Sequence, residues 1–362
     1  MTSLEHIFQC WDQFKRGKRK RKDTQLFERH LEDNIFQLRE DLITFQYSHA
    51  PYQQFYVTDP KQRHISKAVV RDRLVHQMVY DTFTQVLDKK FIFHSFSSRL
   101  GKGTHEGVTK LHQMIGKVSK NGAFPCFALK TDIRRFFDTV HLCTLKGLLR
   151  KYIKDEGTLK IIDIIIDSFK VAHDQADPVG IPLGNVTSQL FANVYLHELD
   201  DFIKQSIKEK YYLRYCDDFI ILSSSENHLK SLIGVIRDFL SQKLRLELHP
   251  KKVMISKLGS GIDFLGYVLF ENHTLMRTTS KQRMKRRLRE AYENYLIGKT
   301  DEVPMDQKLQ SYLGILSYAD QRTLALGIKN AYWVRSGKIA SGKIYNSPAD
   351  AGIKTRNKRS MS

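Results

Sequence analysis

Residues 211–222 read YYLRYCDDFIIL, and this stretch decides the fold. Two short runs of aromatic and aliphatic residues flank Cys216, Asp217 and Asp218, a pattern that predicts a hairpin of two strands. Such a hairpin can pack its strand residues while the acids at its tip project outward. Aspartate is common in turns for local hydrogen-bonding reasons, so the pair indicates a functional site only together with other acids.

A third acid, Asp132, follows an apolar run at residues 124–129 that predicts another buried strand. Transfer of a nucleotidyl group uses two divalent cations roughly 3.5 to 4 Å apart, and Mg²⁺ prefers carboxylate oxygens. Asp132 at a strand end and Asp217 at a hairpin tip can supply those ligands. The sequence therefore predicts a catalytic site for two Mg²⁺ ions, which Mn²⁺ could replace.

The chain of 362 residues is strongly basic, with 59 Lys and Arg against 39 Asp and Glu and a formal charge of +20. This charge favours a polyanionic partner, because neutralised phosphates release bound counterions. A basic protein without such a partner could have the same composition, so charge alone does not decide. Hydrophobic side chains make up 41% of the chain, enough for a core that is divided among several subdomains.

Two clusters of cations are candidate nucleic-acid contacts. The first has seven cations in the eight residues 15–22, and the second spans residues 281–289. Cations this close repel one another unless an anion is near, which favours RNA contact over a solvated face. The candidate residues are Lys18, Arg19, Arg21, Arg283, Arg286 and Arg287.

Cysteine usage and hydropathy predict a soluble, cytoplasmic protein with no membrane partner. The four cysteines are too widely spaced for a zinc knuckle and too few for a disulfide framework. The most apolar stretch, residues 159–169, contains Asp163 and Asp167, and the N-terminus has no apolar signal segment.

These motifs together resemble a reverse transcriptase over roughly residues 50–320. The stretch KTDIRRFF at 130–137 resembles the family's first catalytic block, and YCDD at 215–218 matches its tyrosine-x-aspartate-aspartate signature. The resemblance implies template RNA, an RNA/cDNA hybrid and deoxynucleoside triphosphates as partners. It also implies that the catalytic, metal-binding residues are Asp132, Asp217 as the stronger ligand of its pair, Asp218 in support, and the backbone carbonyl of Ile133.

The same resemblance assigns further residues to the nucleotide. Phe137 lies where the family has an aromatic ring that crowds a ribose 2′-hydroxyl, which favours deoxynucleotides. Arg63, assisted by Lys61, resembles the arginine that grips the triphosphate. Lys252 occupies the region of a lysine near the leaving pyrophosphate, with Lys251 as the alternative.

The stretch FLGY at residues 264–267 resembles the family's primer grip. Phe264, Leu265 and Gly266 are therefore expected in a tight hairpin that positions the primer end.

Residues 180–193, GIPLGNVTSQLFAN, indicate which kind of reverse transcriptase this is. Leu183 stands where retroviral, retron and group II intron enzymes usually have glutamine, and Gln189 where they usually have proline. The pattern is similar to that of diversity-generating retroelements, as are the blocks at 71–77 and 101–105. Those enzymes copy a template-repeat RNA with frequent errors at adenines. The resemblance also implies a small basic accessory variability protein, which could be oligomeric.

Leu183 and Gly184 are expected to contact the incoming nucleotide. A glutamine at position 183 could hydrogen-bond the nucleotide sugar, whereas leucine offers only packing. We expect this loss of positional control to contribute to misincorporation.

Two alternatives remain open at the level of the sequence. A retron-like or phage-defence reverse transcriptase would share the catalytic motifs and make DNA for another purpose. A non-catalytic RNA-binding protein would be expected to have lost an acid at one of the three positions, and all three acids are present.

The predicted fold class is α+β, a right-hand polymerase with fingers, a palm and a basic helical thumb. Among its elements, the residue patterns predict a strand pair with a turn from Tyr52 to Ile65, a helix from Leu142 to Tyr152, and a second strand pair at residues 245–248 and 253–256. The expected divisions are a basic N-terminal arm and helix at 1–49, fingers at 50–123, the first part of the palm at 124–141, fingers and palm helices at 142–179, the palm with the catalytic hairpin and primer grip at 180–270, the thumb at 271–335 and a basic flexible tail at 336–362.

Overall fold

The computed structural model describes residues 1–59, 61–169, 178–300 and 302–335. It divides into two compact units, residues 1–265 with 269–271, and residues 266–268 with the chain from Asn272 onward. The predicted tail at 336–362 lies outside the described residues, as do residues 170–177 of the segment predicted to hold fingers and palm helices. Among the described helices, none is long and apolar enough to cross a membrane.

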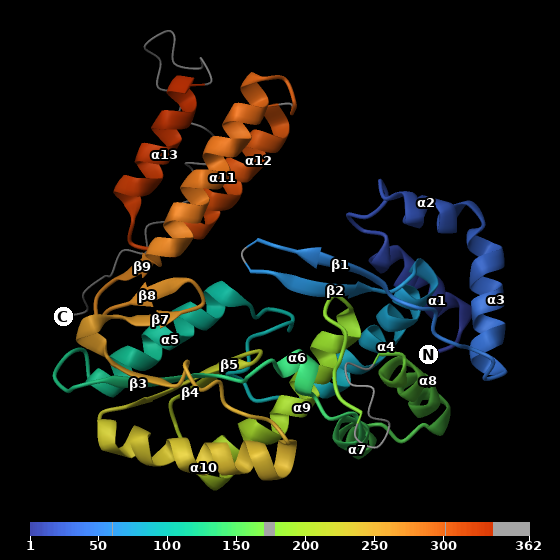
Figure 1. The fold of residues 1–362 in the computed structure, drawn as a ribbon, viewed down its shortest axis with the longest axis horizontal. Coiled ribbons are helices and arrows are strands. Elements are labelled where there is room, and N and C mark those ends of the chain that lie inside the picture. The colour runs from blue at the N-terminus through green and yellow to red at the C-terminus, as the bar shows by residue number, and fades with distance from the viewer. Residues whose placement is uncertain (60, 170–177, 301, 336–362) are drawn as a thin grey trace, which may run out of the picture. The chain divides into compact units, whose positions relative to one another are not determined.

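The first unit is built on an antiparallel sheet of four strands in the order β4-β5-β3-β6 (Figure 1). The strands are β3 (Phe127–Asp132), β4 (Tyr212–Tyr215), β5 (Asp218–Ser223) and β6 (Met254–Lys257). β4 and β5 form the predicted hairpin. β3 is the strand predicted before Asp132, and it extends far enough to include that residue.

Helices cover the sheet on both faces. In Figure 1 the sheet lies between α5 (Thr104–Ser119) and α10 (Glu226–Leu244). α9 (Val186–Asp201), which continues into a π-helical turn at Phe202–Ser206, packs against α10. Successive strand residues point to opposite faces, so a strand that is covered on both sides is apolar throughout. This explains why the four residues 219–222 of β5 are all buried.

The N-terminal residues fold into the main core of the first unit. α1 (Leu4–Phe14) begins after Ser3, whose side chain accepts a hydrogen bond from the backbone N–H of His6. The helix packs on α4 (Val70–Asp88), and α2 (Lys22–Arg29) and α3 (Leu31–Ile43) follow it. The buried face of α1 consists of Ile7, Cys10, Trp11 and Phe14, which recur at helical spacing.

The predicted basic arm that leads into a single helix differs from the structure. The basic run is the connection between α1 and α2, and it turns at Gly17, where φ is +69°. The helix predicted after it breaks at His30, whose φ of −122° and ψ of 44° separate α2 from α3. The prediction of an N-terminal arm is wrong because the apolar face of α1 packs into the core ahead of the basic run.

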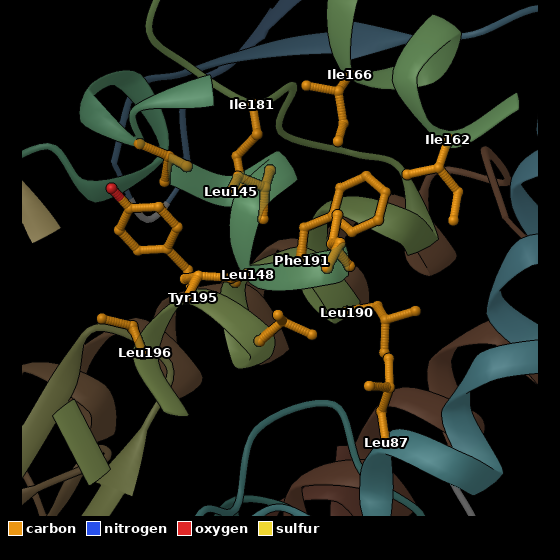
Figure 2. Close-up of a cluster of buried hydrophobic side chains, with 14 of the residues drawn as sticks. Leu87, Leu145, Leu148, Ile162, Ile166, Ile181, Leu190, Phe191, Tyr195 and Leu196 are labelled. Carbon is orange, nitrogen blue, oxygen red and sulfur yellow. The ribbon is translucent and has the colours of Figure 1, made fainter. Parts of the chain in front are cut away.

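A hairpin and three helices complete the first unit around this core. The hairpin pairs β1 (Gln53–Val57) with β2 (Arg63–Lys67), as predicted from its β-branched and aromatic residues. The helices are α6 (Phe136–Thr139), α7 (Leu142–Tyr152) and α8 (Glu156–Asp167). Figure 2 shows where α7, α8 and α9 meet, with labelled side chains that include Leu145, Leu148, Ile162, Ile166, Leu190 and Phe191.

One predicted strand, residues 245–248, does not form. α10 runs to Leu244 and ends at Arg245 in the left-handed conformation, with φ of 51°. The residues after it form an isolated bridge, between Leu248 and Ile133, and no strand. Leu246 and Leu248 are buried in the core, so their apolar character reflects core packing rather than a strand.

The second unit is mainly helical. Strands β7 (Ile262–Phe264), β8 (Tyr267–Leu269) and β9 (Thr274–Met276) form a small sheet in that order after a 3₁₀ turn at Leu258–Ser260, and the division into units falls within this sheet. The helices that follow are α11 (Thr278–Leu296), α12 (Glu302–Leu316) and α13 (Arg322–Arg335). Their packing buries Met276, Met284, Ala291, Leu309 and Leu316.

Candidate active site

The sheet register brings the three predicted acids together. Asp132, the last residue of β3, is the direct partner of Asp218, the first residue of β5. Directly opposed residues of antiparallel strands have Cα atoms about 4.5 to 5.5 Å apart. Asp217 lies next to Asp218 in the two-residue turn that joins β4 to β5. The candidate site therefore contains three half-buried carboxylates at one end of two adjacent strands.

Burial and mutual repulsion make negative charge costly at this site. Burial is the largest cause that raises the pKa of Asp217, and the charge of Asp132 adds to it, although the backbone N–H of Asp217 and Lys252 act in the opposite direction. Burial also raises the pKa of Asp218 to about 6, followed in effect by Asp217 and Asp132. Divalent cations would strongly stabilise the charged forms of Asp217 and Asp218 in this environment.

Lys252 contacts this group and Lys251 does not. The Nζ of Lys252 forms an ion pair with Oδ2 of Asp132. The backbone places it there, because the N–H of His249 donates to the carbonyl of Asp132 at 2.8 Å and the N–H of Lys252 donates to the carbonyl of His249 at 3.0 Å. Lys251 is exposed. Of the two lysines that the sequence left open, the geometry therefore favours Lys252.

Ile133, whose carbonyl is a predicted metal ligand, directly follows β3. Its side chain is buried, and its backbone makes the bridge to Leu248. The next residue continues this pairing, because the N–H of Arg134 donates to the carbonyl of Glu247 at 2.8 Å. The backbone beyond Asp132 is thus held on the side that carries Lys252.

Phe137 lies beside the loop that contains Leu183 and Gly184. The N–H of Ile181 donates to the carbonyl of Phe137 at 2.8 Å. Phe136 is buried in the core, whereas Phe137 is half-buried and meets the Phe136 ring edge-on at 5.4 Å between centroids. The structure therefore places two predicted nucleotide contacts, the aromatic ring and the loop, on adjoining segments.

The loop of residues 181–185 is hydrogen-bonded to strand β2. The N–H of Ser66 donates to the carbonyl of Leu183 at 3.0 Å, and Nδ2 of Asn185 donates to the carbonyl of Ser66 at 3.0 Å. Between these two bonds Gly184 has a φ of +119°, and a Cβ there would lie 2.9 Å from Cγ2 of Ile65. Glycine is needed at position 184 for both its backbone conformation and its lack of a side chain.

Arg63 and Lys61 lie on the same hairpin as Ser66 but farther from its base. Both side chains are exposed, Arg63 on β2 and Lys61 in the turn before it. The contacts of the described residues do not join either cation to the three acids. Their assignment to the triphosphate remains a prediction.

The predicted primer-grip segment has the expected tight turn. Leu265 and Gly266, which separate β7 from β8, both have positive φ, 49° and 88°. Two-residue hairpin turns of type I′ require positive φ at both positions. Phe264 is buried at the end of β7. The turn is thus confirmed, and its role in holding a primer remains a prediction.

Each of the two predicted basic surfaces contains both exposed and half-buried cations. Arg19 and Arg21 are exposed, but Lys18 is half-buried, because its Nζ donates to the carbonyl of Phe14 at 2.7 Å and lies over the Phe14 ring. Arg286 is exposed on α11, whereas Arg283 and Arg287 are half-buried on the same helix.

The polar side chains behind the turn that carries Asp217 were not predicted from the sequence. Arg214, in the middle of β4, and Asp200, on α9, are fully buried and form an ion pair at 2.6 Å. A charged residue inside an apolar strand is a usable signal, because it is stable there only with a buried partner. Gln189, which stands where related enzymes usually have proline, accepts a hydrogen bond from the Ser98 hydroxyl at 3.0 Å.

The family model for reverse transcriptase (RNA-dependent DNA polymerase) matches residues 58–269, more than half of the 362 residues. This stretch contains the three acids, and the chain belongs to that family. The family copies RNA templates with deoxynucleotides and uses divalent metal ions, generally Mg²⁺. With the mixed helix and sheet architecture, this confirms the predicted right-hand polymerase fold and the assignment to RNA-directed DNA polymerases.

Individual relatives are distant. Protein YkfC of Escherichia coli K12 is 22% identical over 278 residues, which cover 66% of this chain and 71% of YkfC. The group II intron-encoded protein LtrA of Lactococcus lactis subsp. cremoris is 21% identical over 386 residues, 87% of this chain and 62% of LtrA. The putative COX1/OXI3 intron 2 protein of Saccharomyces cerevisiae is 23% identical over 199 residues, 38% of this chain and 23% of that protein.

The chain thus spans less than two thirds of the latter two proteins. Among solved structures, apo telomerase from Candida tropicalis aligns with a TM-score of 0.46 and 13% identity, covering 66% of this chain and 52% of that chain.

Proposed function

We propose that this chain is the reverse transcriptase of a diversity-generating retroelement, which copies a template-repeat RNA into cDNA with errors directed at adenines. The polymerase chemistry rests on one observation, the register that sets Asp132 opposite Asp218 with Asp217 beside them. The choice among reverse transcriptases rests on residues 180–193, in which Leu183 and Gln189 replace the usual glutamine and proline.

The roles of the acids follow from their chemistry. Asp132 and Asp217 would hold two Mg²⁺ ions, with the Ile133 carbonyl and Asp218 in support. The donor set consists of hard oxygen ligands, and two of its acids have raised pKa values that cations would relieve. Bound ions of this kind would activate the primer 3′-hydroxyl and stabilise the pyrophosphate that leaves.

Cations of the protein would serve the triphosphate. Lys252 already neutralises Asp132, and it can turn toward a leaving pyrophosphate because its side chain is 43% exposed. Arg63, with Lys61, would reach the triphosphate from the β1–β2 hairpin, which is tied to the nucleotide loop through Ser66. A planar guanidinium suits this task, since it can bond two phosphate oxygens at once.

Primer extension on an RNA template tests the catalytic part. We expect labelled deoxynucleotides to be incorporated with Mg²⁺ or Mn²⁺ in the presence of the accessory protein. Asp217→Asn should lose at least about 1000-fold of this rate, since metal stabilisation contributes several kcal/mol. Asp238→Asn on the exposed face of α10 is the control. Failure of the wild-type protein to extend any primer would favour a non-catalytic RNA-binding protein.

Sequencing of the cDNA tests the mutagenic part. Leu183→Gln restores a side chain that can hydrogen-bond the nucleotide sugar, and it should lower the error frequency at template adenines. Leu183→Ile, which keeps an apolar side chain, should leave that frequency high. Equal error frequencies in the wild type, Leu183→Gln and Leu183→Ile would show that Leu183 does not contribute to misincorporation at adenines.

The genome around the gene decides between kinds of retroelement. A diversity-generating retroelement requires a template repeat and a matching variable repeat near the gene. If neither is present, a retron-like or phage-defence enzyme is the better assignment.

A further inference from the structure

A fully buried ion pair lies directly behind the turn that carries Asp217. Nε of Arg214 donates to Oδ1 of Asp200 at 2.7 Å, and Nη2 donates to Oδ2 at 2.6 Å. The hydroxyl of Tyr212 donates to the same carboxylate at 2.7 Å. Both charged side chains have no exposed surface. The carboxylate and two sides of the guanidinium are therefore fixed in a bidentate arrangement.

The third side of the guanidinium holds the turn itself. Nη1 of Arg214 donates to the carbonyl of Cys216 at 3.1 Å and to Oδ1 of Asn193 at 3.3 Å. That carbonyl belongs to the peptide that joins Cys216 to Asp217. Cys216 has a φ of 55°, in the left-handed region that is unfavourable for most residues with a side chain. The bond from Arg214 thus restrains a peptide that follows a strained residue.

The backbone around Arg214 is anchored as well. Its N–H donates to the carbonyl of His94 at 2.9 Å, and its carbonyl accepts from the N–H of Phe96 at 2.9 Å. Asn193 ties its helix to the same segment, because its Nδ2 donates to the carbonyl of Ser97 at 3.0 Å. Residues 94–97 therefore hold the outer edge of β4 in place through backbone hydrogen bonds to Arg214. The side chain of Arg214 in turn holds the turn through its bond to Cys216.

We infer that Arg214, held by Asp200, is a positioning residue that fixes the Cys216–Asp217 peptide and thereby the place of the Asp217 carboxylate in the metal site. This inference rests on the proposed role of Asp217. Stability alone does not explain the arrangement, because apolar residues often replace a buried ion pair without loss of stability. An arginine is required because one lysine ammonium cannot bond a carboxylate at two points and also reach a carbonyl on its far side.

Two variants separate positioning from stability. Arg214→Lys keeps a cation for Asp200 and loses the bond to Cys216. The double variant Arg214→Met with Asp200→Leu removes both charges, which avoids an unpaired buried charge. Leu38→Ala in α3, a fully buried residue of the core, is the control that lowers stability without touching the turn. Each protein is first compared by thermal unfolding.

The readouts are Mn²⁺ binding to the protein, followed by electron paramagnetic resonance, and primer extension. For both Arg214 variants we expect Mn²⁺ affinity to fall at least about tenfold and kcat to fall about 100-fold, since a 1 Å displacement of a reacting group has effects of that size. The Mg²⁺ concentration for half-maximal rate should rise, and KM for the primer-template should stay unchanged. Leu38→Ala should match the wild type in all of these below its Tm.

The outcomes distinguish this inference from the proposed active site. If Asp217→Asn binds Mn²⁺ and extends primers like the wild type, the active-site assignment is wrong and the inference falls with it. If Asp217→Asn is inactive while a folded Arg214 variant keeps wild-type Mn²⁺ binding and kcat, only the inference is overturned. Should the double variant not fold, Arg214→Lys decides alone, because it retains the paired charge.

Discussion

Phe137 is the residue proposed to decide the choice of sugar. Its ring is half-buried rather than absorbed into the core, and its carbonyl accepts a hydrogen bond from the N–H of Ile181, at the start of the loop of residues 181–185. The ring packs against the core and meets the Phe136 ring edge-on, which restricts its movement. Replacing Phe136 would disrupt the core, whereas Phe137 can be shortened while the core stays intact.

Phe137→Ala should therefore relax discrimination between deoxynucleotides and ribonucleotides. We expect the ratio of kcat/KM values for the two sugars to fall by about 10- to 100-fold, since steric exclusion by one side chain contributes about 1 to 3 kcal/mol. Single-nucleotide incorporation with each triphosphate measures the ratio. Phe137→Tyr, which keeps the ring, is the control. A ratio unchanged by the alanine would show that Phe137 does not contact the sugar.

At the residue scale, the acids could be predicted from the sequence and their supports could not. Asp132, Asp217 and Asp218 stand in short motifs, so local spacing identifies them. The choice of Lys252 over Lys251 depends on a bond between His249 and Asp132, which are far apart in the chain. Arg214 and Asp200 could be found only as charges in apolar surroundings, since nothing in the spacing indicates that they meet.

At the scale of elements, strand β2 and the loop of residues 181–185 lie so close together that their contact requires a glycine. Two hydrogen bonds flank Gly184, and Ile65 fills the space that a side chain would need. The two segments can approach this closely only because position 184 is glycine. The hairpin that carries Arg63 is thereby coupled to the loop that carries Leu183.

Gly184→Ala should separate these elements. The positive φ and the contact with Ile65 predict a loss of about 1 to 3 kcal/mol in the free energy of unfolding, together with a higher KM for deoxynucleotides. Gly147→Ala is the matched control, since it lies in α7 with nothing within 4 Å of an added Cβ and should stabilise by about 0.5 to 1 kcal/mol. Denaturant unfolding and steady-state kinetics test both, and an unchanged KM in Gly184→Ala would argue against the coupling.

Helices were predicted well where the sequence contains both a capping residue and a regular apolar spacing. α7 matches its predicted bounds, because His141 caps its first turn and the apolar spacing continues to Tyr152. The break between α2 and α3 and the missing strand at 245–248 were not predicted, because tertiary packing overrides the propensities of single residues there.

At the scale of the whole molecule, the formal charge of +20 makes binding to nucleic acid dependent on salt. If residues of α11 contact RNA, then replacing Arg283, Arg286 and Arg287 by alanine should make the slope of log K against log salt concentration less negative by about 2, at about 0.7 per phosphate contact on a single strand. The control replaces three exposed cations of α10, Lys230, Arg237 and Lys243. Equal slopes in the two triple variants would mean that only net charge matters.

Stability of the first unit should also depend on pH through His76. Burial, followed by the nearby His49, lowers the pKa of His76 to about 3 from an ordinary value of 6.5. Its Nε2 lies 3.1 Å from Nε2 of His49 and its Nδ1 lies 2.5 Å from the Thr187 hydroxyl, so both ring nitrogens already have hydrogen-bond partners inside the protein. Above pH 6.5 both the folded and unfolded states hold it neutral, and below that pH only the unfolded state gains a proton.

The free energy of unfolding should therefore fall as the pH drops from about 6.5 toward 3. His76 alone should contribute a loss of about 2 kcal/mol between pH 7 and pH 5. Denaturant unfolding at both pH values, compared with His76→Gln, isolates this contribution, because the other histidines are common to the two proteins. The variant should be less stable at pH 7 and should lose about 2 kcal/mol less on acidification. An equal loss in both proteins would assign the pH dependence to other groups.

The pairing of β3 with β5, from Phe127 opposite Ser223 to Asp132 opposite Asp218, has a consequence for how such enzymes can diverge. A one-residue slip between strands turns every side chain to the other face of the sheet. An insertion or deletion inside either strand would therefore carry an acid away from its partners, whereas loops of the connection between them can change in length without breaking this pairing. Alignments of distant relatives should place their gaps in loops within residues 133–211 and keep 127–132 and 212–223 unbroken.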